Sequence, residues 1–316
     1  MKKILPFGCS LLFTISLVTS LKSQTPTDAI MMSKGLICVA VVYTNDTWDE
    51  YWEGELLRVN GNVGTLTRQT IMPMATLGIG ERFNIIAALP WAKTESSGGQ
   101  IAGTSGLQDW GFWLKGTAID AEIGPGSLTL HGTAGITGPA SNYLADYGPY
   151  SLGLGCADGT LRGILQYKLN MGVYLRGQAG YHLRGNARAE RDYYYTTHGV
   201  YSDKIDMPDA VSWGATLGTW LFNNSLKVEA NYGGFNSLDG HDIRRQDVGF
   251  PSNEMINTTI GGGLQYYFPG IQGFGFVLSA HQVLTGRNVG KSTAYSAGVT
   301  YFFPVWKTDE TEPIEN

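Results

Sequence analysis

Along most of this chain, short segments alternate between apolar and polar side chains, and this period of two restricts the fold more than any other feature. In the nine residues Tyr295–Phe303, the odd-numbered positions are apolar or aromatic, and the even-numbered positions are small or polar except for Phe302. Successive side chains of a β-strand point to opposite faces, so this segment is expected to form a strand with one apolar face. Pro304 then ends the ladder of hydrogen bonds. One such strand fits a soluble sandwich as well as a membrane barrel.

The N-terminus predicts export. Lys2 and Lys3 precede an apolar run over residues 4–18, and small polar residues follow, which is the pattern of a secretory signal peptide over residues 1–23. An uncleaved anchor is the alternative, but the run is short for one. No later run of about 18 apolar residues predicts a transmembrane helix. An exported chain of this kind can still cross a membrane as a closed β-barrel, in which every backbone group has a partner.

The composition favours strands that face lipid. Charged residues make up only 16% of the 316 residues, whereas soluble domains average about 25%. The net charge of −5 and the lack of a Lys/Arg-rich run argue against nucleic acid as a partner. Cys38 and Cys156 fall in distant segments, so we expect unpaired thiols and no disulfide.

Alternation and turn residues divide the remaining chain into about twelve strands. The expected strands cover residues 33–44, 64–79, 83–93, 107–119, 127–137, 160–169, 172–184, 210–221, 226–234, 254–268, 273–284 and 295–303. The connections are alternately short turns and long polar loops, as in outer-membrane barrels with short periplasmic turns and long external loops. We therefore predict an all-β fold, a transmembrane antiparallel up-and-down β-barrel, over residues 24–303. An acidic periplasmic tail is expected over residues 304–316.

Two sets of residues resemble known outer-membrane proteins. Tyr295–Phe303 is similar to the closing strand of bacterial outer-membrane barrels, whose terminal aromatic residue is a signal to the barrel-assembly machinery. A second resemblance, to the family named "MetA-pathway of phenol degradation", rests on residues 77–90, which end in Leu89-Pro90, on residues 105–109 (SGLQD) and on residues 113–116 (WLKG). Gln108 stands where that family usually has glycine. The resemblance implies a barrel with a transport role in the outer membrane of a Gram-negative bacterium, and it does not imply phenol as the substrate.

Polar and charged residues collect on the second face of the predicted strands. A charge on the lipid face costs ~2–4 kcal/mol per Lys or Arg near the middle of the membrane, so these residues are expected to line the lumen and to bind solute. They are Arg68, Lys115, His131, Arg162, Gln166, Lys168, Arg176, Gln178, His182, Arg184, Lys227 and Glu229, with Asn231 and Gln265 on the same face. One hypothesis is a net positive wall that favours anionic solutes. The alternative is that these residues pair with loop acids, namely Asp46, Glu50, Glu53 and Asp109, and fill a closed lumen.

Aromatic residues near the predicted strand ends suit rings at the membrane–water boundary. These residues are Trp91, Trp110, Tyr167, Tyr232, Tyr266, Tyr301 and Phe303. A lipid hydrolase would need a serine and a histidine within reach of each other on the outward face, but Ser279 and His281 share a face that is expected to point inward. The histidines are scattered without the spacing of metal ligands, so no metal or other cofactor is predicted.

The sequence thus predicts an outer-membrane channel or transporter for a small solute of anionic, aromatic or hydrophobic character, and no enzyme. The alternative is a barrel that does not transport and whose loops have an adhesive or structural role, or, with less support, an outer-membrane lipid hydrolase. The expected partners are outer-membrane lipid, the solute and the assembly machinery that recognises Tyr295–Phe303. The sequence leaves open whether a loop or the N-terminal lead closes the pore.

Overall fold

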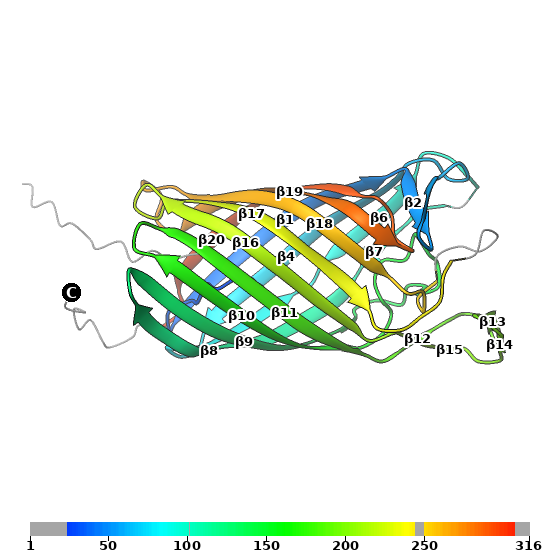
Figure 1. Cartoon of the computed structure of the whole chain (residues 1–316), viewed down its shortest axis with the longest axis horizontal. Helices are drawn as coiled ribbons and strands as arrows, with labels where there is room; N and C mark the ends of the chain where they lie inside the picture. The colour runs from blue at the N-terminus through cyan, green and yellow to red at the C-terminus, as the bar shows by residue number, and fades with distance from the viewer. Residues whose placement is uncertain (1–23, 101, 244–249, 307–316) are drawn as a thin grey trace, which may run out of the picture.

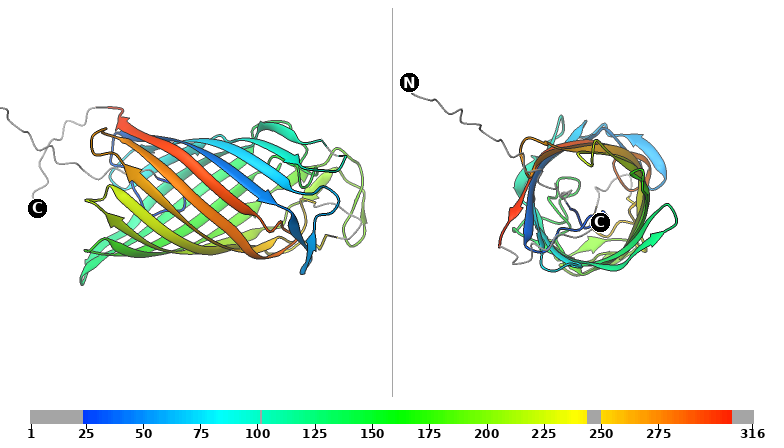
Figure 2. Two further views of the ribbon diagram at one scale, coloured as in Figure 1. Left: turned by 90° about the horizontal axis from the view of Figure 1, so that it is seen from above. Right: turned by 90° about the vertical axis from the view of Figure 1, so that its left-hand side faces the viewer.

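The computed structural model describes residues 24–100, 102–243 and 250–306 of the chain. The predicted signal peptide and most of the predicted acidic tail lie outside these described residues. The described part is an all-β structure in which one antiparallel sheet closes into a twelve-stranded barrel (Figures 1 and 2). Within it, no helix is long and apolar enough to span a membrane.

The sheet has fourteen strands, and two pairs of them continue one another along the wall, so the barrel is twelve strands around. The strands of the wall are β1 (Leu36–Trp48), β4 (Leu66–Gly78), β5 (Phe83–Ala88), β6 (Trp91–Ser96), β7 (Thr104–Leu107), β8 (Asp109–Ile123), β9 (Gly126–Pro139), β10 (Asp158–Leu169), β11 (Val173–Arg184), β16 (Ala210–Leu221), β17 (Leu226–Ser237), β18 (Ile256–Tyr267), β19 (Phe274–Arg287) and β20 (Thr293–Pro304). The strands β5 and β6 form one interrupted strand of the wall, and β7 and β8 form another. The predicted fold class and number of strands are confirmed.

Closure is made by β1, which pairs with β4 on one side and with β20 on the other. Val41, for example, lies between Pro73 of β4 and Val299 of β20. The predicted closing segment Tyr295–Phe303 therefore forms the last strand of the ring. Because the ring has no free edge, backbone groups inside the membrane have partners along both sides of every strand.

Two expected strands depart from a regular ladder in the structure. The strand expected over residues 83–93 divides between β5 and β6, because Leu89 donates its amide to the Pro73 carbonyl and Pro90 has no amide hydrogen to donate. A second irregularity is a bulge in β8 between Thr117 and Ile119, which allows both of these positions to pair regularly with β9. Neither irregularity opens the ring, because the neighbouring strands remain paired.

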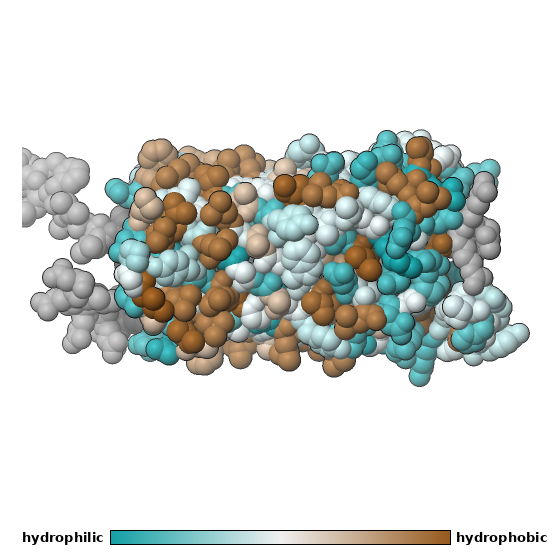
Figure 3. Space-filling view, viewed as in Figure 1, coloured by the Kyte–Doolittle hydropathy of each residue, from teal (hydrophilic) through white to brown (hydrophobic). Residues whose placement is uncertain are grey.

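The outer surface carries a band of exposed apolar side chains, seen as brown patches over the left and middle parts of the barrel in Figure 3. These side chains alternate along each strand with residues that point inward. They include Val39, Val41, Ile71, Phe112, Leu114, Leu161, Leu165, Leu175, Leu217, Ile260, Leu278 and Val299. A soluble protein rarely exposes so many large apolar groups together, whereas a membrane barrel requires them.

The two ends of the barrel differ in their connections. Short turns at residues 79–82, 124–125, 170–172, 222–225 and 268–273 gather at the end where β1 begins and β20 ends. Long connections gather at the other end, which is hydrophilic in Figure 3. By the rule for outer-membrane barrels, the end with short turns faces the periplasm. We refer to the two ends as periplasmic and extracellular.

The long extracellular connections have structure of their own. The six strands that they contain are β2 (Glu50–Glu53), β3 (Leu56–Val59), β12 (Asn186–Arg188), β13 (Tyr194–Tyr195), β14 (Gly199–Val200) and β15 (Lys204–Asp206). A small apolar cluster joins the β9–β10 and β11–β16 connections through residues such as Ala145, Cys156 and Ile205. Burial raises the pKa of the Cys156 thiol to about 11, so this thiol stays protonated at neutral pH. No disulfide joins the described cysteines Cys38 and Cys156.

Adjacent residues of β10 provide a test of the two faces. Leu165 is 49% exposed on the outer surface, and Gln166 lies on the inner face. We expect Leu165→Arg to lower the free energy of unfolding in phospholipid vesicles by about 2–4 kcal/mol, because it places a charge in hydrocarbon. Gln166→Arg should cost less than about 1 kcal/mol, because the lumen is polar. Urea titrations followed by tryptophan fluorescence would measure both values, and equal losses would contradict this assignment of faces.

Candidate functional site

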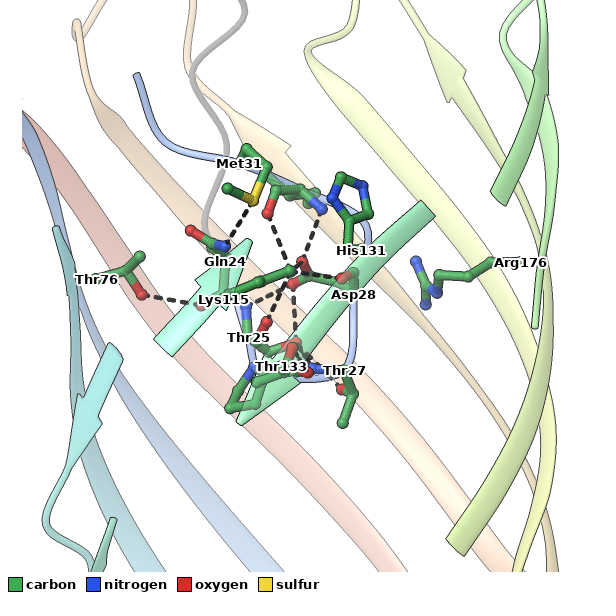
Figure 4. A network of polar contacts seen from close by, with 12 residues as sticks. Gln24, Thr25, Thr27, Asp28, Met31, Thr76, Lys115, His131, Thr133 and Arg176 are labelled. Carbon is green, nitrogen blue, oxygen red and sulfur yellow. Dashed lines mark hydrogen bonds and ion pairs between the residues drawn. The ribbon is translucent and has the colours of Figure 1, made fainter. Parts of the chain in front are cut away.

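The N-terminal segment, residues 24–32, lies inside the barrel lumen (Figure 4). Its two ends, Gln24 and Met32, are each only 1% exposed. The Asn84 side chain of β5 donates a hydrogen bond of 2.9 Å to the Met32 carbonyl, and Thr76 of β4 donates one of 3.4 Å to the Gln24 carbonyl. The segment forms no strand with the wall, so side chains of the wall hold it in place.

A compact turn shapes this segment around Asp28. The Thr25 amide and hydroxyl both donate to Oδ2 of Asp28, at 2.5 and 2.8 Å, and the Ile30 amide donates to Oδ1 at 2.9 Å. Asp and Thr side chains commonly make such local bonds, and Pro26 restricts the backbone between them. The carboxylate is therefore held in a fixed position in the lumen.

Lys115 of β8 is the main contact between the wall and this segment. Its side chain is 0% exposed, and Nζ lies 2.9 Å from Oδ1 of Asp28. The same ammonium group donates to the backbone carbonyls of Thr25, Asp28 and Ile30 at 3.1, 2.5 and 3.1 Å. A buried ammonium requires such partners, since its desolvation is costly. All four acceptors belong to the N-terminal segment, so this segment neutralises and solvates Lys115.

A second cluster of charges lies on the facing wall, where β11, β16 and β17 are neighbours. Glu229 accepts hydrogen bonds from Arg176 at 2.9 Å and from the Tyr174 hydroxyl at 2.6 Å, and Lys227 lies 3.3 Å from its second oxygen. Arg176 also donates to Thr216 at 3.2 Å. One carboxylate therefore balances two cations here, and Figure 4 shows Arg176 across the lumen from Asp28.

A cavity of about 160 Å³ separates the N-terminal segment from this second cluster. Its lining consists of Ala29, Ile30 and Met31 on the segment and of Gln166, Lys168, Tyr174, Arg176, Trp220 and Lys227 on the wall. The cavity is the space in the periplasmic half of the lumen where a small solute could contact both the wall and the segment.

A third cluster lies on the wall nearer the extracellular end. Asp158 of β10 is 3.2 Å from Nδ1 of His182 and 3.5 Å from Nε of Arg184, both on β11. Nε2 of His182 is 2.9 Å from the Ser212 hydroxyl of β16. These contacts join three adjacent strands and leave the local charges largely paired.

The connection between β9 and β10, residues 140–157, folds across the extracellular end of the lumen. Arg68 of β4 donates to the Ser151 carbonyl at 3.2 Å and also to the Leu152 carbonyl. Thr94 of β6 donates to the Tyr150 carbonyl at 2.8 Å, and Tyr150 is fully buried. Parts of the chain therefore lie inside the lumen toward both of its ends.

The predicted luminal residues are brought together into these groups. Lys115 and His131 lie beside the N-terminal segment. The residues at or beside the cavity are Gln166, Lys168, Arg176, Lys227 and Glu229. On the rest of the wall, His182 and Arg184 contact Asp158, Arg162 donates to Gln178 at 2.8 Å, and Arg68 donates to the β9–β10 connection. Whether they bind solute remains a prediction.

Of the four loop acids considered in the sequence, Asp46 and Asp109 interact electrostatically with Arg68, whereas Glu50 and Glu53 pair outside the lumen. Glu50 pairs with Lys291 at 2.8 Å and Glu53 with Arg58 at 2.6 Å, both in the extracellular connections. The carboxylates that pair with the luminal cations of the described chain are those of Asp28, Asp158 and Glu229. The strand alternation had identified only Glu229. The run Thr25-Pro26-Thr27-Asp28 was a turn signal that could have indicated a folded N-terminal segment.

Chemistry other than solute binding finds little support in the described residues. No group of three His, Cys, Asp or Glu side chains among them could hold a metal ion. Ser279 pairs with Ser296 and His281 pairs with the fully buried Ala294, so both lie on the inward face of β19. A lipid hydrolase would need this pair on the opposite face.

Comparison with known proteins supports the fold. The chain matches no protein-family model and no curated protein. The structure of the COG4313 outer membrane channel from Pseudomonas putida F1 is similar, with a TM-score of 0.70 and 13% identity over 89% of this chain and 100% of that chain. The fold is that of an outer-membrane barrel. The NanC porin is less similar, with a TM-score of 0.46 and 7% identity over 82% of this chain and 98% of that chain.

The closed ring and its apolar band are those of a barrel that spans a membrane, because only closed barrels or helices satisfy backbone groups there, and this agrees with the predicted location in the outer membrane of a Gram-negative bacterium. The resemblance to the "MetA-pathway of phenol degradation" family stays a prediction, since no family model matches the chain.

Substitution of Lys115 tests how the N-terminal segment is held. Removing one partner of a buried ion pair costs about 3 kcal/mol, so Lys115→Met should raise the released population of residues 24–32 by roughly a hundredfold. Hydrogen exchange measured by mass spectrometry should then be faster in the peptide that contains these residues. Arg162→Met removes an equal charge from the same wall, but Arg162 donates to Gln178 and makes no described hydrogen bond to residues 24–32, so this variant should leave the peptide protected. Equal exchange in the two variants would rule out Lys115 as the anchor.

Proposed function

We propose that this protein is an outer-membrane channel for small solutes, which conducts when the N-terminal segment moves from its place in the lumen. The observation that carries the proposal is that residues 24–32 occupy the lumen without pairing with any strand. A ring that holds a peptide segment together with a cavity of about 160 Å³ is wide enough for a small solute once the segment shifts. Movement of the segment breaks no backbone ladder of the barrel, so the wall stays intact.

Small anions are the favoured solutes. Around the N-terminal segment, the side chains of Lys115, Lys168, Arg176 and Lys227 carry positive charge, and those of Asp28 and Glu229 carry negative charge. Charged rings in a narrow pore select ions of the opposite sign. Displacement of the segment would also remove Asp28 from the lumen, which increases the positive excess.

A barrel without transport is the second candidate, and the β9–β10 connection favours it. This connection and the N-terminal segment both lie in the lumen and narrow it, and the strands β12–β15 extend beyond the wall at the extracellular end (Figure 1). In that case the extracellular connections would carry an adhesive or structural function.

Single-channel recording distinguishes the two candidates. In planar bilayers we expect wild-type protein to give intermittent current and Lys115→Met to give larger and more continuous current, because its N-terminal segment is no longer anchored. Arg162→Met is the matched control for anchoring, and its current should stay as intermittent as that of wild type, because Arg162 makes no described hydrogen bond to the segment. Correctly folded Lys115→Met protein that passes no current would favour the barrel without transport.

Reversal potentials test the preference for anions. In a gradient of potassium chloride at low salt, the potential should have the sign of a chloride-selective pore. The preference should weaken at 1 M salt, where the Debye length falls to about 3 Å. Lys168→Glu should reduce it further, since this side chain faces the cavity. A cation-selective wild-type pore would contradict the proposal for the solute while leaving the channel itself in place.

A further inference from the structure

We infer that the cavity beside the N-terminal segment is a binding site for a small carboxylate anion. This inference rests on the proposed channel function and specifies where a solute stops within the lumen. The carboxylate would lie between β10 and β11 on the wall and residues 29–31 of the segment, with its oxygens on Arg176 and Lys168.

The cavity has hydrogen-bond donors that the described residues leave without acceptors. Arg176 is 8% exposed, and its Nε has no hydrogen-bond partner, although its terminal nitrogens bind Glu229 and Thr216. Lys168 lies within ion-pair distance of no acidic group in the described chain, and the amide of Gln166 makes no hydrogen bond to a described residue. An arginine Nε buried without an acceptor is costly, so an occupant that accepts from it is favoured.

The acids nearest to the cavity are already engaged. Glu229 accepts from Tyr174 and Arg176 through one oxygen and lies beside Lys227 through the other. Asp28 bonds with Thr25, Ile30 and Lys115. Neither carboxylate forms an ion pair with Lys168 in the described chain, so the positive charge of Lys168 is left without a paired acid at the cavity.

The remaining lining suits the rest of a small organic acid. Trp220 and Tyr174 line the wall side, and Ile30 and Met31 line the segment side. A volume of about 160 Å³ admits an acid of a few carbon atoms and not a sugar chain. A carboxylate can offer one oxygen to Nε of Arg176 and the other to the ammonium of Lys168, whereas chloride is a single spherical acceptor, which favours a carboxylate over chloride.

Ligand-observed NMR on the full chain in detergent measures this binding without current. The probes are sodium butyrate and the neutral butyramide, which has the same shape without the charge. Wild-type protein should give a saturable signal with butyrate and not with butyramide. Lys168→Gln should weaken butyrate binding by about tenfold, as for one charge-assisted hydrogen bond. Arg176→Lys keeps the charge beside Glu229 but removes Nε, and it should weaken binding to a similar extent.

Lys291→Gln is the matched control, because it removes one positive charge from the extracellular connections, where Lys291 pairs with Glu50, and it should bind butyrate as wild type does. The site is ruled out if butyrate binds equally to wild-type, Lys168→Gln and Arg176→Lys proteins, or if butyramide binds as well as butyrate. Saturable butyrate binding by protein that passes no current would retain the site and reject the channel. Current without saturable binding would retain the channel and reject the site.

Discussion

Hydrocarbon offers no hydrogen bonds to a peptide group, and the rest of this structure depends on that constraint. A sheet with an open edge would leave a row of amides and carbonyls unpaired, each at a cost of several kcal/mol. The pairing of β1 with both β4 and β20 removes the edge. Once the ring is closed, alternation along each strand divides every side chain between lipid and lumen. The apolar band and the charged interior are therefore two results of the same closure.

Closure also creates an electrostatic difficulty inside the ring. Lys115 points into a confined space, where bulk water cannot solvate its ammonium group fully. Residues 24–32 supply the missing acceptors, because they place one carboxylate and three carbonyl oxygens around the Lys115 nitrogen. The N-terminal segment thus binds the wall as a ligand would, but it is tethered to β1 by the chain itself. Because the tether keeps the segment at a high effective concentration near its binding site, few contacts are enough to hold it.

The strands and the inward direction of the charged residues could be predicted because both follow from a local period of two. The alternation around Arg162 and Arg176 needs only the cost of a charge in lipid to assign its face. The position of the N-terminal segment could not be found in this way. Its residues have no period, and its partners Asn84, Thr76 and Lys115 lie on strands far along the sequence. The turn around Asp28 was visible as Thr-Pro-Thr-Asp, but nothing local indicates where in the barrel such a turn docks.

The interruption at Leu89 and Pro90 was missed for a related reason. The proline was visible, but the predicted strand continued through it, since Trp91 keeps the parity of the preceding apolar residues. In the structure, β4 bridges the break by pairing with β5 and then with β6. A neighbouring strand can supply continuity that the interrupted strand lacks. Single-sequence patterns contain no information about that neighbour.

The two halves of the lumen differ in how their cations are neutralised, and this difference has a consequence for function. Near the extracellular end, Arg184 is balanced by Asp158, which belongs to a strand and cannot leave without unfolding the barrel. Near the periplasmic end, Lys115 is balanced by Asp28, on a segment without strand pairing, and Lys168 has no described counter-charge. Asp28 is therefore the charge partner in the described lumen that can depart while the ring stays closed. The luminal charge can therefore change at this contact without breaking a ladder of backbone hydrogen bonds.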